Sequence, residues 1–398
     1  MERKLKFVFA SDSFKGTLSS AETAELLGKA AEEIFPGCCF CGVPVADGGE
    51  GTVEAVTAAA GGPIRRLTVC GPLMEKTESF YGELPGGRAI IEMAAASGLP
   101  MVPEEKRNPL NTTTYGTGEL IADAMERGYR DITVAIGGSA TNDGGMGALR
   151  ALGAVFLDRN GKKLTGCGRE LEQVETICLD RLNPLVQDTR FTVMCDVTNP
   201  LTGPDGATYT FGKQKGGTPE ILDRLEAGMI HYAGCLEAAS GKKVREIPGA
   251  GAAGGLGAAL MAVLHGVLQP GIETVLDLID FDRLISGADL VVTGEGRMDW
   301  QSAFGKVPGG VAARAERKGI PVIALVGGMG PGCEKLYSMG IQSIMVTPDG
   351  PMELKEALER AGELYYGAAL RMFRMVRAGW QMAASGQEKQ ERCAEREK

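Results

Sequence analysis

Histidine is almost absent from this chain, which contains only His231 and His265 among its 398 residues. Neither histidine lies in the glycine- and acid-rich segments that carry the chemical signal described below. A serine or cysteine nucleophile usually needs a neighbouring histidine as its base. The sequence therefore disfavours Ser-His-Asp and Cys-His catalysis.

Positive charge is outnumbered by negative charge, and long apolar segments are scarce. The formal net charge is −9, which predicts neither a nucleic-acid partner nor binding to a membrane surface. The apolar stretch 7–10 is too short for a signal peptide core. Residues 247–272 are uncharged but contain seven Gly and two Pro, so a glycine-rich loop that leads into a buried helix is expected there rather than a membrane span. We expect a cytoplasmic protein.

The ten cysteines are scattered and do not form a metal-binding pattern. Cys38 and Cys41 make one C-x-x-C pair, but no second pair lies near it. A structural zinc site needs four ligands, and a thioredoxin-like pair would open a helix. Both interpretations are disfavoured, and most cysteines are expected to be buried, reduced thiols.

Strand and helix patterns alternate at both ends of the chain, which is typical of a parallel sheet. In the middle, the short strands expected at 65–69, 78–83 and 88–93 follow one another closely, which favours an antiparallel or mixed sheet. We expect one parallel α/β domain built from both chain ends, with a mixed-sheet α/β domain inserted into it. The predicted domains are 1–62 with 287–384, and 63–286. The charged tail 385–398 has no apolar face and is expected to be disordered.

Four expected strands end in loops of glycine and acidic or polar residues, at 43–51, 132–147, 191–205 and 290–299. Glycine lets a ligand approach the backbone closely, and carboxylates can bind Mg²⁺ or accept a proton. Phosphoryl transfer needs positioned cations and little covalent help from the protein. The pattern therefore favours nucleotide-dependent phosphoryl transfer.

The first loop contains Ser11, Asp12, Ser13 and Lys15, directly after the first expected strand. Ligands of open parallel sheets bind beyond the carboxyl ends of the strands, so Lys15 is a candidate to hold a carboxylate or phosphate. The alternative is that Asp12 only shapes the turn.

Acidic residues in two further loops are candidates for Mg²⁺ binding or for accepting a hydroxyl proton. They are Asp47, with Glu50 close by, and Asp196. Ser139 and Asn142 offer donors just before an expected helix. The alternatives are turns that cap the following helices.

Residues 249–254 fit the pattern G-x-G-x-x-G, but Pro248 and a charged segment precede them instead of a strand. A dinucleotide fold is therefore disfavoured. The glycines either cradle a phosphate at a helix N-terminus or permit close packing. Gly305-Lys306 is not a phosphate-binding P-loop, because Trp300 and Val307 occupy required positions. Lys306 is a candidate phosphate-neutralising cation, or else a surface lysine.

Seven segments together resemble the type I glycerate kinase family and span most of the chain in order. They are SDSFKGTLSSAE (11–22), PVADGGEGT (44–52), IGGSATNDGGMGALRALG (136–153), CDVTNPLTGPDGAT (195–208), FGKQKG (211–216), PGAGAAGGLG (248–257) and TGEGRMDWQSAFGKVP (293–308). The resemblance implies that the domain made from the chain ends is flavodoxin-like. It also implies ATP and Mg²⁺ as cofactors and D-glycerate as substrate, with 2-phosphoglycerate or 3-phosphoglycerate as product. Whether the protein forms a homo-oligomer stays open.

On this basis we assign expected roles to the candidate residues. The catalytic candidates are Asp47, Asp196, Lys15 and Arg297. The substrate- and phosphate-binding candidates are Ser11, Asp12, Ser13, Ser139, Asn142, Asn199, Gly251, Gly254, Gly255 and Lys306. Glu295 and Asp299 are the candidates for holding Mg²⁺. An NAD-dependent oxidoreductase and a non-catalytic binding module for a sugar acid remain the alternative functions.

Overall fold

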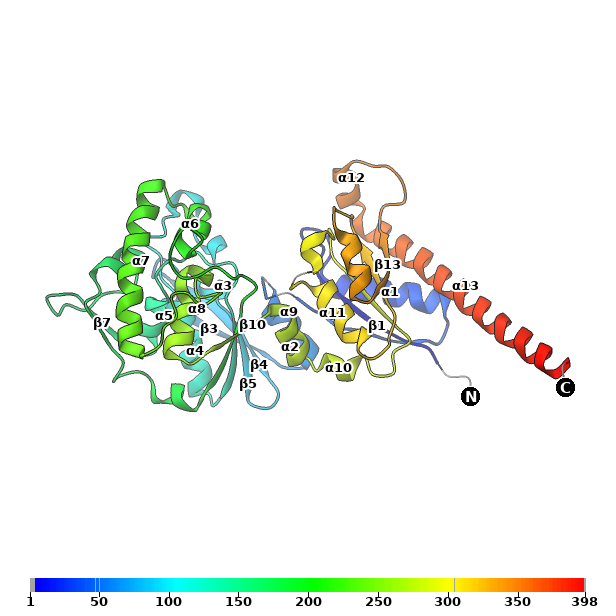
Figure 1. Cartoon of the computed structure of the whole chain (residues 1–398), viewed down its shortest axis with the longest axis horizontal. Helices are drawn as coiled ribbons and strands as arrows, with labels where there is room; N and C mark the ends of the chain where they lie inside the picture. Colours follow the sequence, from blue (N-terminus) through cyan, green and yellow to red (C-terminus); the bar gives the residue numbers. More distant parts are fainter. Residues whose placement is uncertain (1–3, 47, 50, 304, 397–398) are drawn as a thin grey trace. The chain divides into compact units, whose positions relative to one another are not determined.

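The computed structural model describes residues 4–46, 48–49, 51–303 and 305–396. The chain divides into two compact units, each with a sheet of its own (Figure 1). Unit 1 comprises residues 1–47 and 276–398, and unit 2 comprises residues 48–275. The domain boundaries expected from the sequence, after residues 62 and 286, stay a prediction. Among the described residues, no helix is both long and apolar enough to cross a membrane.

Unit 1 contains a five-stranded sheet in which every neighbouring pair is parallel. The strands, in the order in which they lie in the sheet, are β2 (Cys39–Gly42), β1 (Lys6–Ser11), β11 (Leu290–Gly294), β12 (Val322–Val326) and β13 (Ile341–Val346). Numbered within the unit, this order is 2-1-3-4-5, the order of flavodoxin-like folds. The two-domain α/β fold expected from the sequence is confirmed.

Unit 1 contains several helices. They are α1 (Ser20–Ile34), α10 (Phe281–Leu284), α11 (Val307–Glu316), α12 (Leu354–Glu359) and α13 (Ala361–Arg396), with α9 (Gly271–Leu278) at the unit boundary. Of these, α1, α11 and α13 pack against the sheet of the unit. Successive strand residues point to opposite faces of a sheet. Phe7 and Phe9 accordingly pack into a core with Phe373 of α13. Ser19 starts α1 through a capping box with Glu22.

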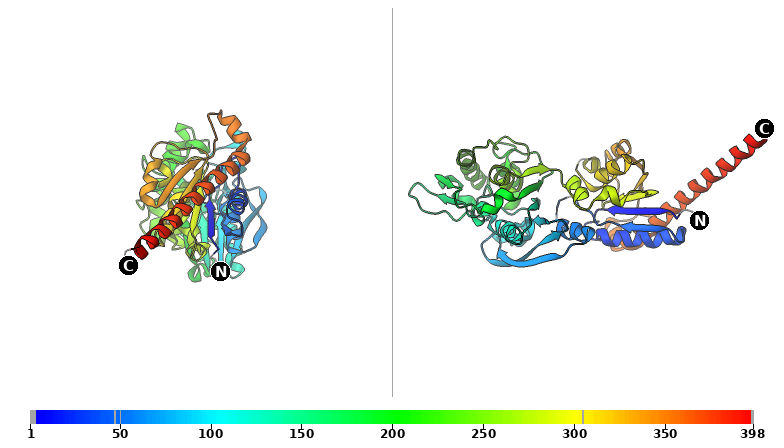
Figure 2. Two further views of the ribbon diagram at one scale, coloured as in Figure 1. Left: turned by 90° about the vertical axis from the view of Figure 1, so that its right-hand side faces the viewer. Right: turned by 90° about the horizontal axis from the view of Figure 1, so that it is seen from below.

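The C-terminal helical tract differs from its expected form. The sequence predicts one tract over 353–384, whereas the structure breaks it at Arg360 into α12 and α13. Figure 2 shows α13 running beside α1 and continuing past it. The disorder expected for 385–398 stays a prediction.

Unit 2 contains a six-stranded mixed sheet. Its strands, in sheet order, are β10 (Val267–Gln269), β9 (Arg190–Met194), β6 (Asp131–Ala135), β5 (Arg88–Glu92), β4 (Lys76–Leu84) and β3 (Ile64–Cys70). The first four are parallel, and β4 pairs antiparallel with both β5 and β3. A two-stranded sheet joins β7 (Val155–Leu157) and β8 (Thr176–Cys178).

The helices of unit 2 are α2 (Thr52–Ala60), α3 (Ala94–Ser97), α4 (Tyr115–Glu126), α5 (Met146–Ala151), α6 (Ala207–Phe211), α7 (Pro219–Ser240) and α8 (Ala252–Val263). Thr218 followed by Pro219 is a sequence pattern that predicts the start of a helix. Helix α7 begins there, and the hydroxyl of Thr218 accepts from the N–H of Ile221. The core of the unit includes Ile91, Val134 and Leu260.

Candidate functional site

A cavity lies where the two central strands of unit 1 end. β1 and β11 run in register up to Ser11 and Gly294, and the N–H of Asp12 donates to the carbonyl of Gly294 at 2.8 Å. This pair of strands is the point at which the strand order reverses, where ligands bind in doubly wound folds. The cavity has a volume of about 350 Å³. Of the predicted site residues that the structure describes, six line it together: Asp12, Ser13, Lys15, Glu295, Arg297 and Lys306.

Three cations give this cavity its positive side. Lys15 and Arg297 are exposed, whereas Lys306 is half-buried and precedes the first turn of α11. The N-terminus of a helix favours anions, so Lys306 and α11 act in the same direction. The arrangement suits a carboxylate and a phosphoryl group.

Glu295 is the buried carboxylate of the cavity. Glu295 is only 5% exposed, and its Oε1 has no hydrogen-bond partner among the described residues. Burial raises the pKa of Glu295 to about 7, although Ser302 and Lys306 act in the opposite direction. A carboxylate with a free oxygen in such a place can bind a cation or accept a proton.

Among the predicted residues of unit 1 that the structure describes, two do not line the cavity. Ser11 is buried at the end of β1, and its hydroxyl has no hydrogen-bond partner among the described residues. Asp299 accepts from the N–H of Gln301 at 2.9 Å and so shapes the short helical turn that follows. The described residues include no group of three His, Cys, Asp or Glu side chains placed to hold a metal. Mg²⁺ commonly takes only one or two protein carboxylates together with substrate phosphates, so Glu295 fits as a single ligand.

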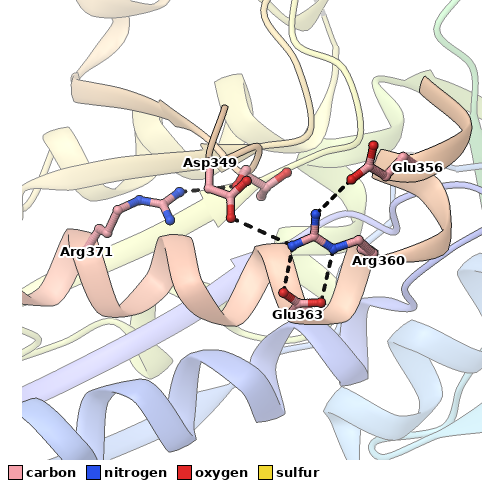
Figure 3. Close-up of polar contacts among 6 residues, drawn as sticks. Asp349, Glu356, Arg360, Glu363 and Arg371 are labelled. Carbon is pink, nitrogen blue, oxygen red and sulfur yellow. Dashed lines mark hydrogen bonds and ion pairs between the residues drawn. The ribbon is translucent and has the colours of Figure 1, made fainter. Parts of the chain in front are cut away.

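An apolar wall, which the sequence analysis missed, completes the cavity. Leu354, Ala357 and Leu358 of α12 line it. Just after α12, the guanidinium of Arg360 donates to Glu356 at 3.0 Å and to Glu363 at 2.7 Å, and it lies 3.8 Å from Asp349 (Figure 3). These contacts tie α12 to α13 and to the loop after β13. The only sequence signal for this wall was the helical pattern that contains it.

In unit 2, the loop after β6 contains two predicted residues, Ser139 and Asn142. Both are buried; the Asn142 amide donates to Thr208 Oγ1 at 3.2 Å, and its Oδ1 has no hydrogen-bond partner among the described residues. The hydroxyl of Ser139 accepts from Lys215 Nζ at 2.8 Å. Gly137 and Gly138, just before Ser139, are exposed.

Lys215 is a residue that the sequence analysis did not single out, although it lies in the segment FGKQKG. It is 2% exposed and also donates to the carbonyl of Thr141 at 2.7 Å. Burial lowers the pKa of Lys215 to about 7, and Asp143 acts in the opposite direction. A buried ammonium that contacts the loop after β6 is unusual enough to indicate a functional position.

Close backbone packing surrounds the predicted glycines. A Cβ on Gly251 would lie 2.2 Å from the carbonyl oxygen of Pro200, and one on Gly254 would lie 2.1 Å from that of Thr141. Gly255 has φ +93°, and a Cβ there would lie 2.8 Å from the Cα of Gly144. Asn199 accepts from the N–H groups of Gly249 and Gly251 through its carbonyl. This packing alone accounts for glycine at these positions, and their role in phosphate binding stays a prediction.

Of the candidate proton acceptors Asp47 and Asp196, the structure describes only Asp196. Asp196 is exposed after β9, and its Oδ1 accepts from the N–H of Gly271 at 2.8 Å. Asp47 and Glu50 lie outside the described residues. The role of Asp47 stays a prediction.

Comparison with known proteins gives one consistent result. A sequence model described as the glycerate kinase family matches residues 7–377. The chain is 45% identical over 360 residues to a protein of Bacillus subtilis (strain 168) named glycerate kinase, covering 90% of this chain and 94% of that protein. It is 46% identical over 358 residues to one of Escherichia coli (strain K12) named glycerate 2-kinase, with the same coverages.

A solved structure agrees in fold. The crystal structure of a candidate glycerate kinase 2 from Salmonella typhimurium LT2 superposes with a TM-score of 0.87 at 42% identity, covering 95% of this chain and 100% of that one. The flavodoxin-like order in unit 1, the mixed sheet of unit 2 and these matches agree with one another. The chain belongs to the glycerate kinase family and is an enzyme of the kinase class.

Proposed function

We propose that this protein is a type I glycerate kinase, which transfers the γ-phosphoryl group of ATP to a hydroxyl of D-glycerate in the cytoplasm. The observation that carries this proposal is the convergence of Lys15, Arg297 and Lys306 on one cavity at the ends of β1 and β11. The names of the relatives supply the substrate. The free state of every described cysteine fits a reducing compartment.

The cations take separate roles in this proposal. Arg297 and Lys15 neutralise the carboxylate of glycerate, because a guanidinium can hold a carboxylate through two parallel hydrogen bonds. Lys306 neutralises the transferring phosphoryl group at the N-terminus of α11. Asp12 and Ser13 orient these groups from the loop after β1.

A carboxylate accepts the proton of the attacking hydroxyl. The hydroxyl oxygen forms a bond to the γ-phosphorus while the bond from that phosphorus to the bridging oxygen breaks, and ADP leaves with the electron pair. Asp47 and Asp196 are the proposed acceptors. Within unit 2, the proposed substrate- and phosphate-binding residues are Ser139, Asn142, Asn199, Gly251, Gly254 and Gly255.

Mg²⁺ would neutralise charge on the nucleotide phosphates. Glu295 is the proposed ligand, because its buried Oε1 lacks a partner among the described residues. Asp299 would contribute from the following turn.

A coupled assay of ADP release tests the activity. ADP release that depends on D-glycerate is expected, and release no faster than in the absence of glycerate would reject the proposal. Asp47→Asn and Asp196→Asn should each lower kcat by about 10²-fold if the residue is the base. If a folded variant keeps a near-normal kcat, the residue that it replaces is not the base.

The product distinguishes the two hydroxyls of glycerate. The name of the E. coli relative favours the 2-hydroxyl, and we therefore propose 2-phosphoglycerate. A ³¹P NMR spectrum of the product tests this choice, since 3-phosphoglycerate gives a different coupling pattern.

A further inference from the structure

A second hollow of unit 2 has an unusual composition. Its volume is about 390 Å³, and its lining includes Tyr115 of α4, Arg150 of α5, Phe156 of β7, and Lys163 and Arg181 from two loops. We name it the Arg150 hollow. The described residues that line it include no carboxylate, although the chain as a whole has a net charge of −9.

The three cations of the Arg150 hollow make no ion pairs within the part of the chain that the structure describes. Among the described residues, neither Arg150, Lys163 nor Arg181 has an ion-pair partner. Cations that face one hollow repel one another, and an anion between them removes that repulsion. A hollow of this kind is therefore a favourable place for a small anion.

Arg150 is already fixed in place. Its guanidinium carbon lies 4.8 Å from the centre of the Tyr115 ring, and Nη1 donates to the carbonyl of Thr165 at 2.5 Å. A guanidinium has five N–H donors, so further donors remain for a ligand. Fixing a side chain in advance lowers the entropy cost of binding.

Arg181 is held beside α5 by its backbone. Gly153 has φ +103°, and a Cβ there would lie only 2.2 Å from the carbonyl oxygen of Arg181. The N–H of Asn183 donates to the carbonyl of Leu152 at 2.7 Å. The loop that carries Arg181 thus lies directly against the end of α5.

Asp143, in the loop after β6, connects that loop to α4 and α5, the helices that carry Tyr115 and Arg150. Its Oδ2 accepts from the N–H and hydroxyl of Thr114, just before Tyr115, and from the N–H of Gly147 in α5. Oδ1 accepts from the N–H of Gly145 at 3.1 Å. A ligand that joins Tyr115, Arg150 and Arg181 would therefore restrain the α4–α5 junction.

We propose that the Arg150 hollow is a binding site for a small organic anion with at least two negative charges on phosphate or carboxylate groups. Binding restrains the motion of the α4–α5 junction, which the hydrogen bonds of Asp143 connect to loop 139–143. Arginine pairs suit both kinds of group through bidentate hydrogen bonds. The volume is at the lower end for ligand sites, which fits a small metabolite.

Calorimetric titration of the full chain tests the binding. The probes are inorganic phosphate, citrate and fructose 1,6-bisphosphate at low ionic strength. The variant is K163Q/R181Q, and the matched control is R159Q/K162Q, which removes two exposed cations that do not line the hollow. We expect the multivalent probes to bind wild type and control equally, and the variant at least ten-fold more weakly.

Three results would overturn the site: no saturable binding at millimolar probe, equal affinity of variant and control, or displacement of the probe by D-glycerate with ADP. Preferential binding of bisphosphate or citrate identifies which group is recognised. None of these measurements uses kinase activity, so they are independent of the proposed function.

Hydrogen exchange tests the junction. In wild type, bound anion should slow exchange of the Thr114, Gly145 and Gly147 amides, which donate to Asp143. The K163Q/R181Q variant should show no change at the same probe concentration. Unchanged exchange in anion-bound wild type would contradict a tightened junction.

Discussion

Lys215 Nζ donates to the hydroxyl of Ser139 across 76 residues of sequence, at a distance of 2.8 Å. The same nitrogen donates to the carbonyl of Thr141 at 2.7 Å. One buried ammonium thereby holds two residues of the loop in which Ser139 and Asn142 are proposed to bind substrate. Lys215 is a positioning residue for that loop.

Replacing Lys215 by Met should impair catalysis. The loop would lose both hydrogen bonds, and a displacement of about 1 Å of a binding group can cost roughly 10²-fold in rate. We expect kcat to fall by about that factor in steady-state kinetics. The control is Lys213→Met, which removes an exposed lysine two residues away and should leave kcat unchanged. A normal kcat in folded K215M would contradict the positioning role, as would equal losses in both variants.

Lys215 should also make stability depend on pH. Its pKa is about 7 in the folded protein against a usual value of 10.5, so the unfolded chain binds more protons between these values. The contribution of Lys215 to the free energy of unfolding therefore rises with pH from about 7 to 10.5. Urea unfolding at pH 7 and pH 9 should show a smaller rise for K215M than for wild type and K213M. An unchanged pH dependence in K215M would mean that Lys215 titrates normally.

Glu295 should appear in the pH profile of the reaction. Its pKa of about 7 means that the carboxylate form, which is the proposed Mg²⁺ ligand, becomes populated as pH rises through neutrality. The Mg²⁺ concentration for half-maximal activity should be higher at pH 6 than at pH 8. In Glu295→Gln this requirement should be high at both pH values, whereas the exposed Glu316→Gln should behave as wild type. A wild-type Mg²⁺ profile in E295Q would exclude Glu295 as a ligand.

The carboxyl group of Glu295 should also make stability depend on pH, with a sign opposite to that of Lys215. Because its folded pKa is raised from 4.5 to about 7, the folded protein binds more protons between these values, and stability falls as pH rises through this window. E295Q should lack this loss and be more stable than wild type at pH 8, measured by thermal unfolding. Equal melting temperatures at pH 8 would contradict a strongly buried charge.

The sequence could predict what depends on local patterns. The cap at Thr218-Pro219, the parallel strands at both chain ends and the loops that follow them all depend on neighbours within a few residues, and the resemblance to the family rested on such segments. The burial of Lys215 could not be predicted, because it depends on Ser139 and Thr141, which are distant in sequence. The break at Arg360 was missed because the helical pattern continues through it, and its ion pairs involve residues on both sides.

Asp143 should be essential for the stability of unit 2. The carboxylate is fully buried and accepts from Thr114, Gly145 and Gly147. Asp143→Asn replaces one acceptor oxygen by a donor that faces other donors, so at least one buried N–H loses its partner. We expect a loss of about 3 kcal/mol in the free energy of unfolding, measured in urea. The exposed Asp188→Asn is the control, and a loss in D143N no larger than in D188N would contradict the network.

Arg360 should control the apolar wall of the cavity. Its contacts with Glu356, Glu363 and Asp349 hold α12, which contributes Leu354 and Leu358 to the lining. Exposed ion pairs contribute little to global stability, so Arg360→Met should barely change the melting temperature. It should raise KM several-fold for the ligand that contacts this wall, since α12 is then less restrained, while kcat stays near normal. The difference in KM between R360M and wild type should shrink at high salt, because salt screens the same ion pairs in wild type.

Arg374→Met provides the control for that experiment, because Arg374 is an exposed cation on the same helix, α13, and does not line the cavity. Its KM values for ATP and D-glycerate should match those of wild type. Measuring both KM values in R360M also identifies the ligand that lies against α12, because only that ligand's KM should rise. If both KM values stay at the wild-type level, the three acidic partners of Arg360 do not hold the wall in its binding position.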